Sequence, residues 1–188
     1  MSATIIRPAT PADIPAIARI YAQAVLHGTA SFEIDPPDEA EMARRHRHIV
    51  EGGYPYCVAE LGGCVRGYAY AAAYRARPAY RFSVEDSVYV DPDAQGHGLG
   101  RALLDAIIAE SERRGFRLMI AVIGDSGNAA SIALHRRAGF EMVGAFRNVG
   151  FKHGRWLDSI LMQRALGEGA ATPPDSGAFS SEAGDRFA

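Results

Sequence analysis

The chain has 188 residues, which is enough for one domain with a substantial core, because domains usually run to about 100–200 residues. Hydrophobic residues make up 48% of the sequence and charged residues 22%, as is usual for a globular protein. The formal net charge of −2 provides no dominant positive field, so the composition favours neither a nucleic acid nor an anionic membrane as partner.

Targeting and redox features are sparse. Residues 1–8 have no basic segment followed by a long apolar core, so we expect no signal peptide. No apolar run approaches the roughly 20 residues that a membrane span needs. Neither Cys57 nor Cys64 has a histidine at zinc-ligand spacing, and we interpret both as reduced packing residues. We therefore expect a cytoplasmic protein without a metal site.

Apolar spacing in the first half of the chain predicts a strand, two helices and then three strands. The expected elements are a strand at 4–9, a helix from 13, a loop at 27–37, a helix at 38–51, and strands at 56–61, 65–74 and 82–90. Gly62 and Gly63 form a turn between the first two strands of that group, because glycine accepts positive φ.

The second half predicts a βαβ unit and two final strands. The expected elements are a helix at 98–114, a strand at 117–123, a helix at 128–138, and strands at 140–149 and 151–161. The strand at 117–123 is almost continuously apolar, which is typical of a strand covered on both faces. The last two strands join near Gly150 or at His153-Gly154. Residues 1–166 then form one mixed α/β domain, and the polar composition of 167–188 predicts a disordered tail.

A glycine-rich turn between a strand and an amphipathic helix is the sharpest local feature. It reads Gln95-Gly96-His97-Gly98-Leu99-Gly100-Arg101. Glycines allow backbone N–H groups to approach an anion, and the helix N-terminus adds about half a positive charge. A pyrophosphate is the natural ligand for such a turn.

Three other interpretations of this turn fit less well. A P-loop needs Lys-Ser/Thr after the last glycine, where this chain has Arg101-Ala102. A dinucleotide fingerprint needs its third glycine one position later than Gly100. A turn with no ligand remains an alternative, although three glycines at alternate positions opening a helix are unusual in ordinary loops.

The turn resembles the Q/R-x-x-G-x-G/A pyrophosphate loop of the GCN5-related N-acetyltransferases (GNAT), and the resemblance covers about Ile5 to Leu166. The segment from Asn128 to Phe140 resembles the family's "N…A…LYEKLGF" segment. Segments 85–90, 121–123, 134–135 and 150–158 are similar to the phosphinothricin and methionine sulfoximine/sulfone acetyltransferases. This implies a GNAT fold, a mixed central sheet of six to seven strands with helices on both faces, and acetyl-CoA as co-substrate without a metal.

The resemblance also implies how the cofactor is held. The strands at 87–90 and 118–123 should separate, so that the pantetheine arm pairs with backbone groups between them. A backbone N–H near Val90 would polarise the thioester carbonyl. The cofactor-binding residues expected from the resemblance are Val88, Tyr89, Val90, Gln95, Gly96, His97, Gly98, Leu99, Gly100, Arg101 and Asn128.

Two side chains are candidate catalytic groups. Glu85 occupies the position of the resembled enzymes' catalytic glutamate and would act as general base on the substrate ammonium, although a solvated strand-end carboxylate is the simpler interpretation. His135 stands where the broader family has a tyrosine acid. It could protonate the leaving thiolate, assist in taking the amine proton, or be structural. Asp86 should point to the opposite sheet face from Glu85, and we give it little weight.

Substrate contacts are inferred from the same region. Arg75 and Arg81 could bind a substrate carboxylate beside Glu85, and Phe32 could line the pocket. Lys152 and Trp156 could shape the far side of the site or a dimer interface. The resembled enzymes are homodimers.

The expected activity is acetylation of the α-amino group of a small amino-acid-like substrate, of the phosphinothricin, methionine sulfone or methionine sulfoximine type. A protein N-terminal acetyltransferase and a non-catalytic acyl-CoA sensor remain alternatives. A peptide acceptor would need an open groove, whereas the loop at 27–37 suggests a covered pocket. A nucleotide-binding protein is a remote third possibility, given the missing lysine and displaced glycine.

Overall fold

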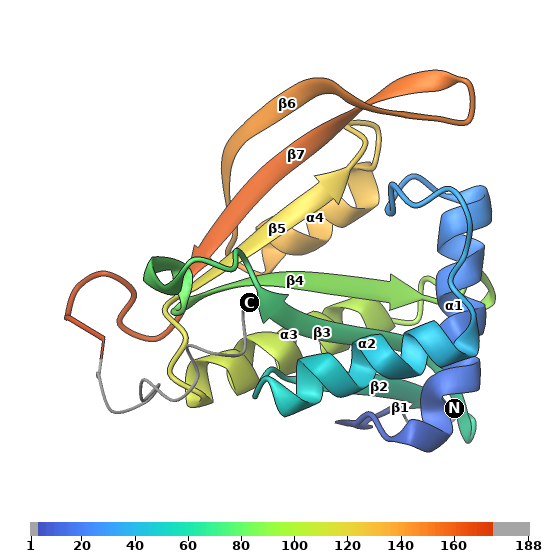
Figure 1. Cartoon of the computed structure of the whole chain (residues 1–188), viewed down its shortest axis with the longest axis horizontal. Helices are drawn as coiled ribbons and strands as arrows, with labels where there is room; N and C mark the ends of the chain where they lie inside the picture. Colours follow the sequence, from blue (N-terminus) through green and yellow to red (C-terminus); the bar gives the residue numbers. More distant parts are fainter. Residues whose placement is uncertain (1–3, 175–188) are drawn as a thin grey trace.

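A mixed seven-stranded sheet with the order β1-β2-β3-β4-β5-β7-β6 forms the centre of the computed structural model, which describes residues 4–174 (Figure 1). The strands are β1 Thr4–Pro8, β2 Tyr56–Leu61, β3 Cys64–Ala73, β4 Ser83–Val90, β5 Leu118–Gly124, β6 Glu141–Lys152 and β7 Arg155–Ala165. The helices are α1 Ile14–His27, α2 Glu39–Glu51, α3 Leu99–Arg113 and α4 Ala129–Arg137. Among the strands of residues 4–174, only β4 and β5 pair in parallel, and α3 connects them, which confirms the predicted βαβ unit.

Helices cover both faces of the sheet, as the sequence predicts. On one face α1 and α2 pack over β2, β3 and β4, with Ile17 and Val25 of α1 fully buried beside Tyr68. On the other face α3 buries Leu103 and Ile107. Helices α1 and α3 have apolar residues at spacings of three and four, and each presents this stripe to the sheet.

The prediction that the strand at 117–123 is covered on both faces is wrong. Met119, Ala121 and Ile123 of β5 are buried in the α3 and α4 layer, but Val122 is 38% exposed. The reason is that α1 and α2 lie over β2–β4 and do not extend across β5. The packing role of Cys57 is confirmed by its burial, whereas Cys64 is exposed next to the β2–β3 turn.

Strands β6 and β7 form a long hairpin whose turn lies at His153-Gly154, the second of the two predicted positions. Both turn residues have positive φ, at 51° and 72°, which explains why the glycine is needed there. Beyond β7, Arg117 donates hydrogen bonds to Thr172 and to the carbonyl of Pro173. Residues 175–188 of the predicted tail lie outside the described residues. In the part that is described, every helix is too short or too polar to cross a bilayer.

Candidate active site

A cleft opens where β4 and β5 stop pairing. Their parallel ladder runs from Ser83 opposite Leu118 to Asp86 opposite Ala121, and ends there. Beyond that point β4 stays bonded to β3 and β5 stays bonded to β7, so the two strands diverge (Figure 1). One backbone edge of residues 87–90 is therefore open, as the resemblance implies for a pantetheine site.

Two cavities occupy this cleft. The smaller, of about 50 Å³, lies at the apex and is lined by Asp86, Ala121 and His135 among others. The larger, of about 430 Å³, extends toward α1 and the glycine-rich turn. Of the predicted cofactor-binding residues, those that line one or both cavities are Val88, Tyr89, Val90, Gln95 and Asn128.

The glycine-rich turn has the conformation that an anion site needs. Gly96 and Gly98 have φ of 79° and 78°, in the region that favours glycine, and Gly98 is the N-cap of α3. The first backbone hydrogen bond into α3 is donated by Ala102 to the Gly98 carbonyl, so the amides of residues 99–101 have no acceptor within the helix. These free amides at the positive end of the helix can bind an anion such as a pyrophosphate.

Side chains in this turn take different roles. Leu99 is 1% exposed and packs in the core, so only its backbone is available to a cofactor. His97 uses its Nδ1 for the carbonyl of Gln95, 3.0 Å away. Arg101 is bound to Asp105 at 2.6 Å, which leaves its guanidinium at the surface beside the helix start. A Cβ at Gly100 would meet only ordinary contacts, so space does not dictate that glycine.

The buried carboxylate of Asp91 holds the start of the glycine-rich turn in place. Asp91, directly after β4, is 3% exposed and accepts hydrogen bonds from Arg19 at 2.9 Å, Arg66 at 3.1 Å and the Asp93 amide at 3.2 Å. Burial alone would raise the pKa of Asp91, but these hydrogen bonds outweigh it and the pKa is lowered. Asp91 therefore ties the start of the turn to α1 and β3, and the sequence analysis missed it.

Glu85 has the electrostatic character of a general base. It lies in the paired part of β4 and is half-buried. Burial, with a smaller effect from the charge of Asp86, raises its pKa from 4.5 to about 7. A carboxylate with that pKa can accept a proton from an ammonium group near neutral pH and release it again.

His135 lies on the other side of β4, against Asp86. His135 Nε2 is 3.0 Å from Asp86 Oδ2, and Nδ1 is 2.8 Å from the Ser131 carbonyl. Burial lowers the pKa of His135, but the hydrogen bond and charge of Asp86 outweigh it, so the pKa is raised. Alternation along β4 correctly separates Asp86 from Glu85, but the contact with His135 joins residues 49 positions apart and no local pattern predicts it.

The loop after α1 is fastened over the cleft. Lys152 is buried and donates from Nζ to the Ser31 carbonyl at 2.7 Å, and the Tyr21 hydroxyl is 2.8 Å from Ser31 Oγ. The ring of Phe32 lies against Gly124 of β5 and Gly150 of β6, where a β-carbon would clash with it. Residues 28–30 of this loop line the larger cavity, whereas Phe32 lines neither cleft cavity, so its role in substrate binding stays a prediction.

Arg75 and Arg81 lie on the exposed connector between β3 and β4. Arg75 stacks on Tyr74, with 5.1 Å from Cζ to the ring centre, and Arg81 lies over Phe82 at 4.5 Å. Neither lines the two cleft cavities. Their role in substrate binding stays a prediction.

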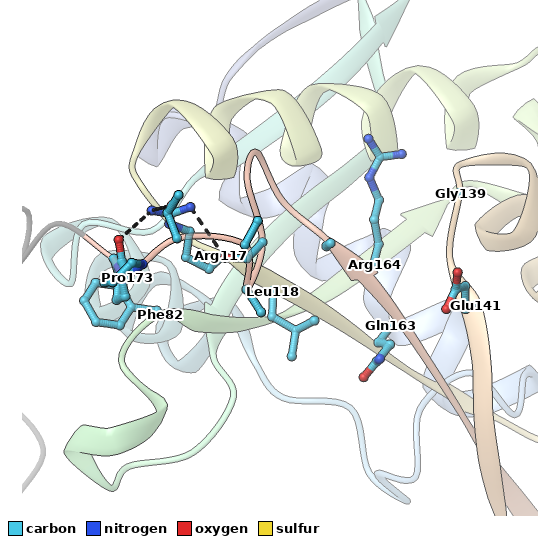
Figure 2. Close-up of a pocket in the computed structure, with 14 residues that line it drawn as sticks. Phe82, Arg117, Leu118, Gly139, Glu141, Gln163, Arg164 and Pro173 are labelled. Carbon is cyan, nitrogen blue, oxygen red and sulfur yellow. Dashed lines mark hydrogen bonds between the residues drawn. The ribbon is translucent and has the colours of Figure 1, made fainter.

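A further cavity of about 850 Å³ lies at the opposite end of β5 (Figure 2). Phe82, Leu118 and Gln163 line it together with residues 169–174. Its two arginines form hydrogen bonds within the chain, since Arg117 donates to the Pro173 carbonyl and Arg164 donates to the Ala138 carbonyl. Among residues 4–174, no three His, Cys, Asp or Glu side chains gather as a metal site requires.

The fold and the cleft define the class of protein. The family model described as "Acetyltransferase (GNAT) domain" matches residues 6–161, which is most of the chain. The protein therefore belongs to the GNAT acetyltransferase family and is an N-acetyltransferase. The seven-stranded sheet, in which β4 and β5 first pair and then separate, is the GNAT fold that the sequence predicts.

The relatives are more specific. The chain is 53% identical over 163 residues to a phosphinothricin N-acetyltransferase of Alcaligenes faecalis, covering 87% of this chain and 83% of the relative. It is 44% identical over 174 residues to the L-methionine sulfoximine/L-methionine sulfone acetyltransferase of Pseudomonas aeruginosa, covering 92% and 100%. A solved phosphinothricin acetyltransferase of Sinorhizobium meliloti in complex with AcCoA is 52% identical, covers 94% of this chain and 95% of its own, and has a TM-score of 0.91.

Proposed function

We propose that this enzyme transfers the acetyl group of acetyl-CoA to the α-amino group of a small amino-acid-like substrate. Phosphinothricin, methionine sulfone and methionine sulfoximine are the candidate acceptors, since relatives that share 44–53% of the sequence are named for them. The observation that carries the proposal is the cleft that opens where β4 and β5 stop pairing, directly after a half-buried glutamate of β4 whose pKa is raised to about 7.

The cleft accounts for cofactor binding in two parts. The amides at the start of α3 provide the site for the pyrophosphate, and the open edge of residues 87–90 provides partners for the pantetheine arm. Asn128 caps α4, accepting from the Ser131 amide at 3.2 Å, and lines both cavities. A backbone N–H of residues 88–90 would then polarise the thioester carbonyl.

Glu85 supplies the proton acceptor. As a base it must be ionised, and with a pKa of about 7 it is partly ionised at neutral pH. It takes a proton from the substrate ammonium, directly or through water, and the free amine then attacks the thioester carbonyl. The role of Phe32, Arg75 and Arg81 in holding the acceptor forms part of this proposal.

The fastened loop favours a small acceptor over a polypeptide. Residues 28–32 are tied to the β6–β7 hairpin by Lys152 and His153, the latter 3.2 Å from the Gly28 carbonyl. A peptide N-terminus would need an open groove at this place. The loop closes that side of the cleft, which supports an acceptor of amino-acid size.

A homodimer is also part of the proposal. β6 is the edge strand of the sheet, and the hairpin exposes a set of large apolar side chains. They are Met142, Val143, Phe146, Val149, Phe151 and Trp156, each 49–60% exposed. Long apolar edge strands left open to water promote association, so we propose that a second copy covers this surface. The domain boundary near residue 166 and a cytoplasmic location stay predictions.

Thiol release from acetyl-CoA tests the activity. The acceptor panel contains phosphinothricin, methionine sulfone, methionine and a short peptide with a free N-terminus, with Glu85→Gln as the matched variant. Release with the amino acids but not with the peptide is the expected result. Release with the peptide alone would support the N-terminal acetyltransferase. Binding of acetyl-CoA without release for any amine would support the sensor.

A further inference from the structure

A buried contact between a histidine and a carboxylate lies at the apex of the cleft. The side chains of His135 and Asp86 are 5% and 2% exposed, and their contact joins α4 to β4. Asp86 stands opposite Ala121 in the last residue pair of the β4–β5 ladder. The contact therefore lies where the two strands begin to separate, and both residues line the apex cavity.

The hydrogen-bond partners of His135 determine the protonation of its ring. Nδ1 is 2.8 Å from the Ser131 carbonyl, which can only accept, and 3.4 Å from the Ser131 hydroxyl, which can donate or accept. Nε2 is 3.0 Å from Asp86 Oδ2, which accepts when the carboxylate is ionised. A neutral imidazole has one N–H, so beside an ionised Asp86 only a ring that is protonated on both nitrogens donates to both the carbonyl and the carboxylate.

We propose that Asp86 is a positioning residue that holds His135 as a doubly protonated cation at the apex of the cleft. The position of the thioester beside this pair rests on the proposed function, whereas the ion pair itself does not. No other ionisable side chain among residues 4–174 forms a hydrogen bond with His135. Phe140 packs edge-on against its ring at 5.0 Å, and Glu85 points to the opposite face of β4.

The cation has a specific consequence for acetyl transfer. When the amine attacks, the C–N bond forms and the C–S bond breaks, with the electron pair left on sulfur. A fixed positive charge near the sulfur stabilises the developing thiolate. After Glu85 has taken the ammonium proton, the attacking nitrogen loses one more proton and the sulfur gains one, so the step balances with no net change in the two protons on His135. His135 is thereby excluded as the base that deprotonates the substrate.

Asp86 also leaves one acceptor for a group in the cavity. Its Oδ1 is buried and has no hydrogen-bond partner among the described residues. Burying a carboxylate oxygen without a partner is costly, so a donor from solvent or from a bound ligand is expected there.

NMR of nitrogen-labelled histidine tests the ion pair without any turnover. The His135 signal is assigned by its loss in His135→Gln. In the wild type both ring nitrogens should be protonated at about pH 7.5, where an ordinary histidine is mostly neutral. In Asp86→Asn the ring should titrate at least about one pH unit lower. Asp86→Glu, which keeps the charge, should restore most of the shift.

Asp38→Asn is the matched control, because Asp38 is an exposed N-cap of α2 and asparagine caps equally well. It should leave the His135 titration unchanged. A neutral His135 ring in the wild type at about pH 7.5 would overturn the proposal. So would an unchanged titration in Asp86→Asn. If Asp86→Asn does not fold, the titrations of the His135 ring in the wild type and in Asp86→Glu still test the proposal.

A kinetic measurement separates positioning from a merely structural role. The alkaline loss of kcat should move to lower pH in Asp86→Asn by the amount that NMR gives for His135. A uniform fall of kcat at all pH values would contradict the proposal. If no amine is acetylated although NMR finds the doubly protonated ring, the proposed function fails while the ion pair stands.

Discussion

Phe32 lies directly over Gly150, so that its Cε2 atom is 2.7 Å from the place a β-carbon on that glycine would take. The two residues are far apart in the sequence, one in the loop after α1 and the other near the end of β6. The ring also contacts the site of a β-carbon on Gly124, at 3.1 Å. Gly124 of β5 and Gly150 of β6 thus leave the space that the Phe32 ring occupies. This contact holds the loop over the cleft.

Gly150→Ala should therefore loosen the loop. The added methyl group displaces the Phe32 ring, and we expect the KM for the amine to rise about tenfold with a smaller change in kcat, because the acceptor is less well positioned. Steady-state kinetics with methionine sulfone measures this. Gly144→Ala is the control on the same strand, since a β-carbon there meets nothing within 4 Å. Equal KM values in the two variants would contradict the role of the Phe32–Gly150 contact in holding the loop.

Lys152 offers a direct readout of the same loop, because it is the only lysine in the sequence. Its burial lowers its pKa, which alone would make the amine more reactive. Since the side chain is buried, we nevertheless expect slow reductive methylation in the wild type. Gly150→Ala should speed the reaction and Gly144→Ala should not. Mass spectrometry after proteolysis separates Lys152 from the N-terminal amine. Rapid methylation of the wild type would show that the loop is not fastened.

Glu85→Gln should lower kcat by about 10²-fold or more if Glu85 is the base. In the wild type the rate should rise with pH through about 7, because the base acts in its ionised form. The variant should lack this dependence. A pH series of kcat/KM with a saturating second substrate measures both, and an unchanged rate would remove Glu85 from the role.

The same substitution should stabilise the fold at alkaline pH. The pKa of Glu85 is raised from 4.5 to about 7 in the folded chain, so its contribution is favourable below pH 4.5 and is lost as the pH rises through 7. Glutamine stays neutral and avoids that loss. Denaturant unfolding should give an advantage on the order of 2 kcal/mol for the variant at alkaline pH, and nearly none at low pH. An equal difference at both pH values would contradict this.

Much of the fold follows from periodicity, and the reasons are local. The apolar spacing of Leu103 and Ile107 predicts α3, and the glycines at 96 and 98 predict the positive-φ turn before it. The coverage of β5 could not be predicted, because an apolar run does not tell whether α1 and α2 reach across it. Val122 is exposed for that reason.

In the candidate site, too, local features could be predicted from the sequence and long-range contacts could not. Residues that belong to one turn or strand, such as Gln95 and Val90, could be placed from the sequence and the resemblance together. Contacts between distant segments could not. Asp86 with His135, and Lys152 with Ser31, join elements 49 and 121 residues apart, and their meeting depends on the whole sheet order.

Asp91→Asn should weaken acetyl-CoA binding. The buried carboxylate holds Arg19 and Arg66 beneath the glycine-rich turn, and an amide cannot replace both charged hydrogen bonds. We expect a several-fold higher KM for acetyl-CoA and a loss of about 1–3 kcal/mol in the free energy of unfolding. The pKa of Asp91 is lowered, so the wild-type advantage should disappear as the pH falls through that pKa.

Asp93→Asn is the matched control for that change. Asp93 belongs to the same turn, but its side chain is exposed and only its backbone amide contacts Asp91. Its KM for acetyl-CoA and its stability should match the wild type. If both variants raised this KM equally, the loss of negative charge near the turn would explain the effect better than the loss of the Asp91 hydrogen bonds.

Trp156→Glu should weaken the proposed homodimer. Trp156 is 60% exposed and packs against Phe151 with ring centres 5.4 Å apart, at the turn end of the apolar hairpin surface. Burying a charge there should weaken association by about 30-fold or more, which corresponds to ~2 kcal/mol. Sedimentation velocity over a range of concentrations measures it. Val50→Glu is the control, since Val50 is 46% exposed on α2, outside the hairpin. Because Trp156 is the only tryptophan, its fluorescence should shift to shorter wavelength as the dimer forms. A wild-type chain that sediments as a monomer at all concentrations would refute the dimer.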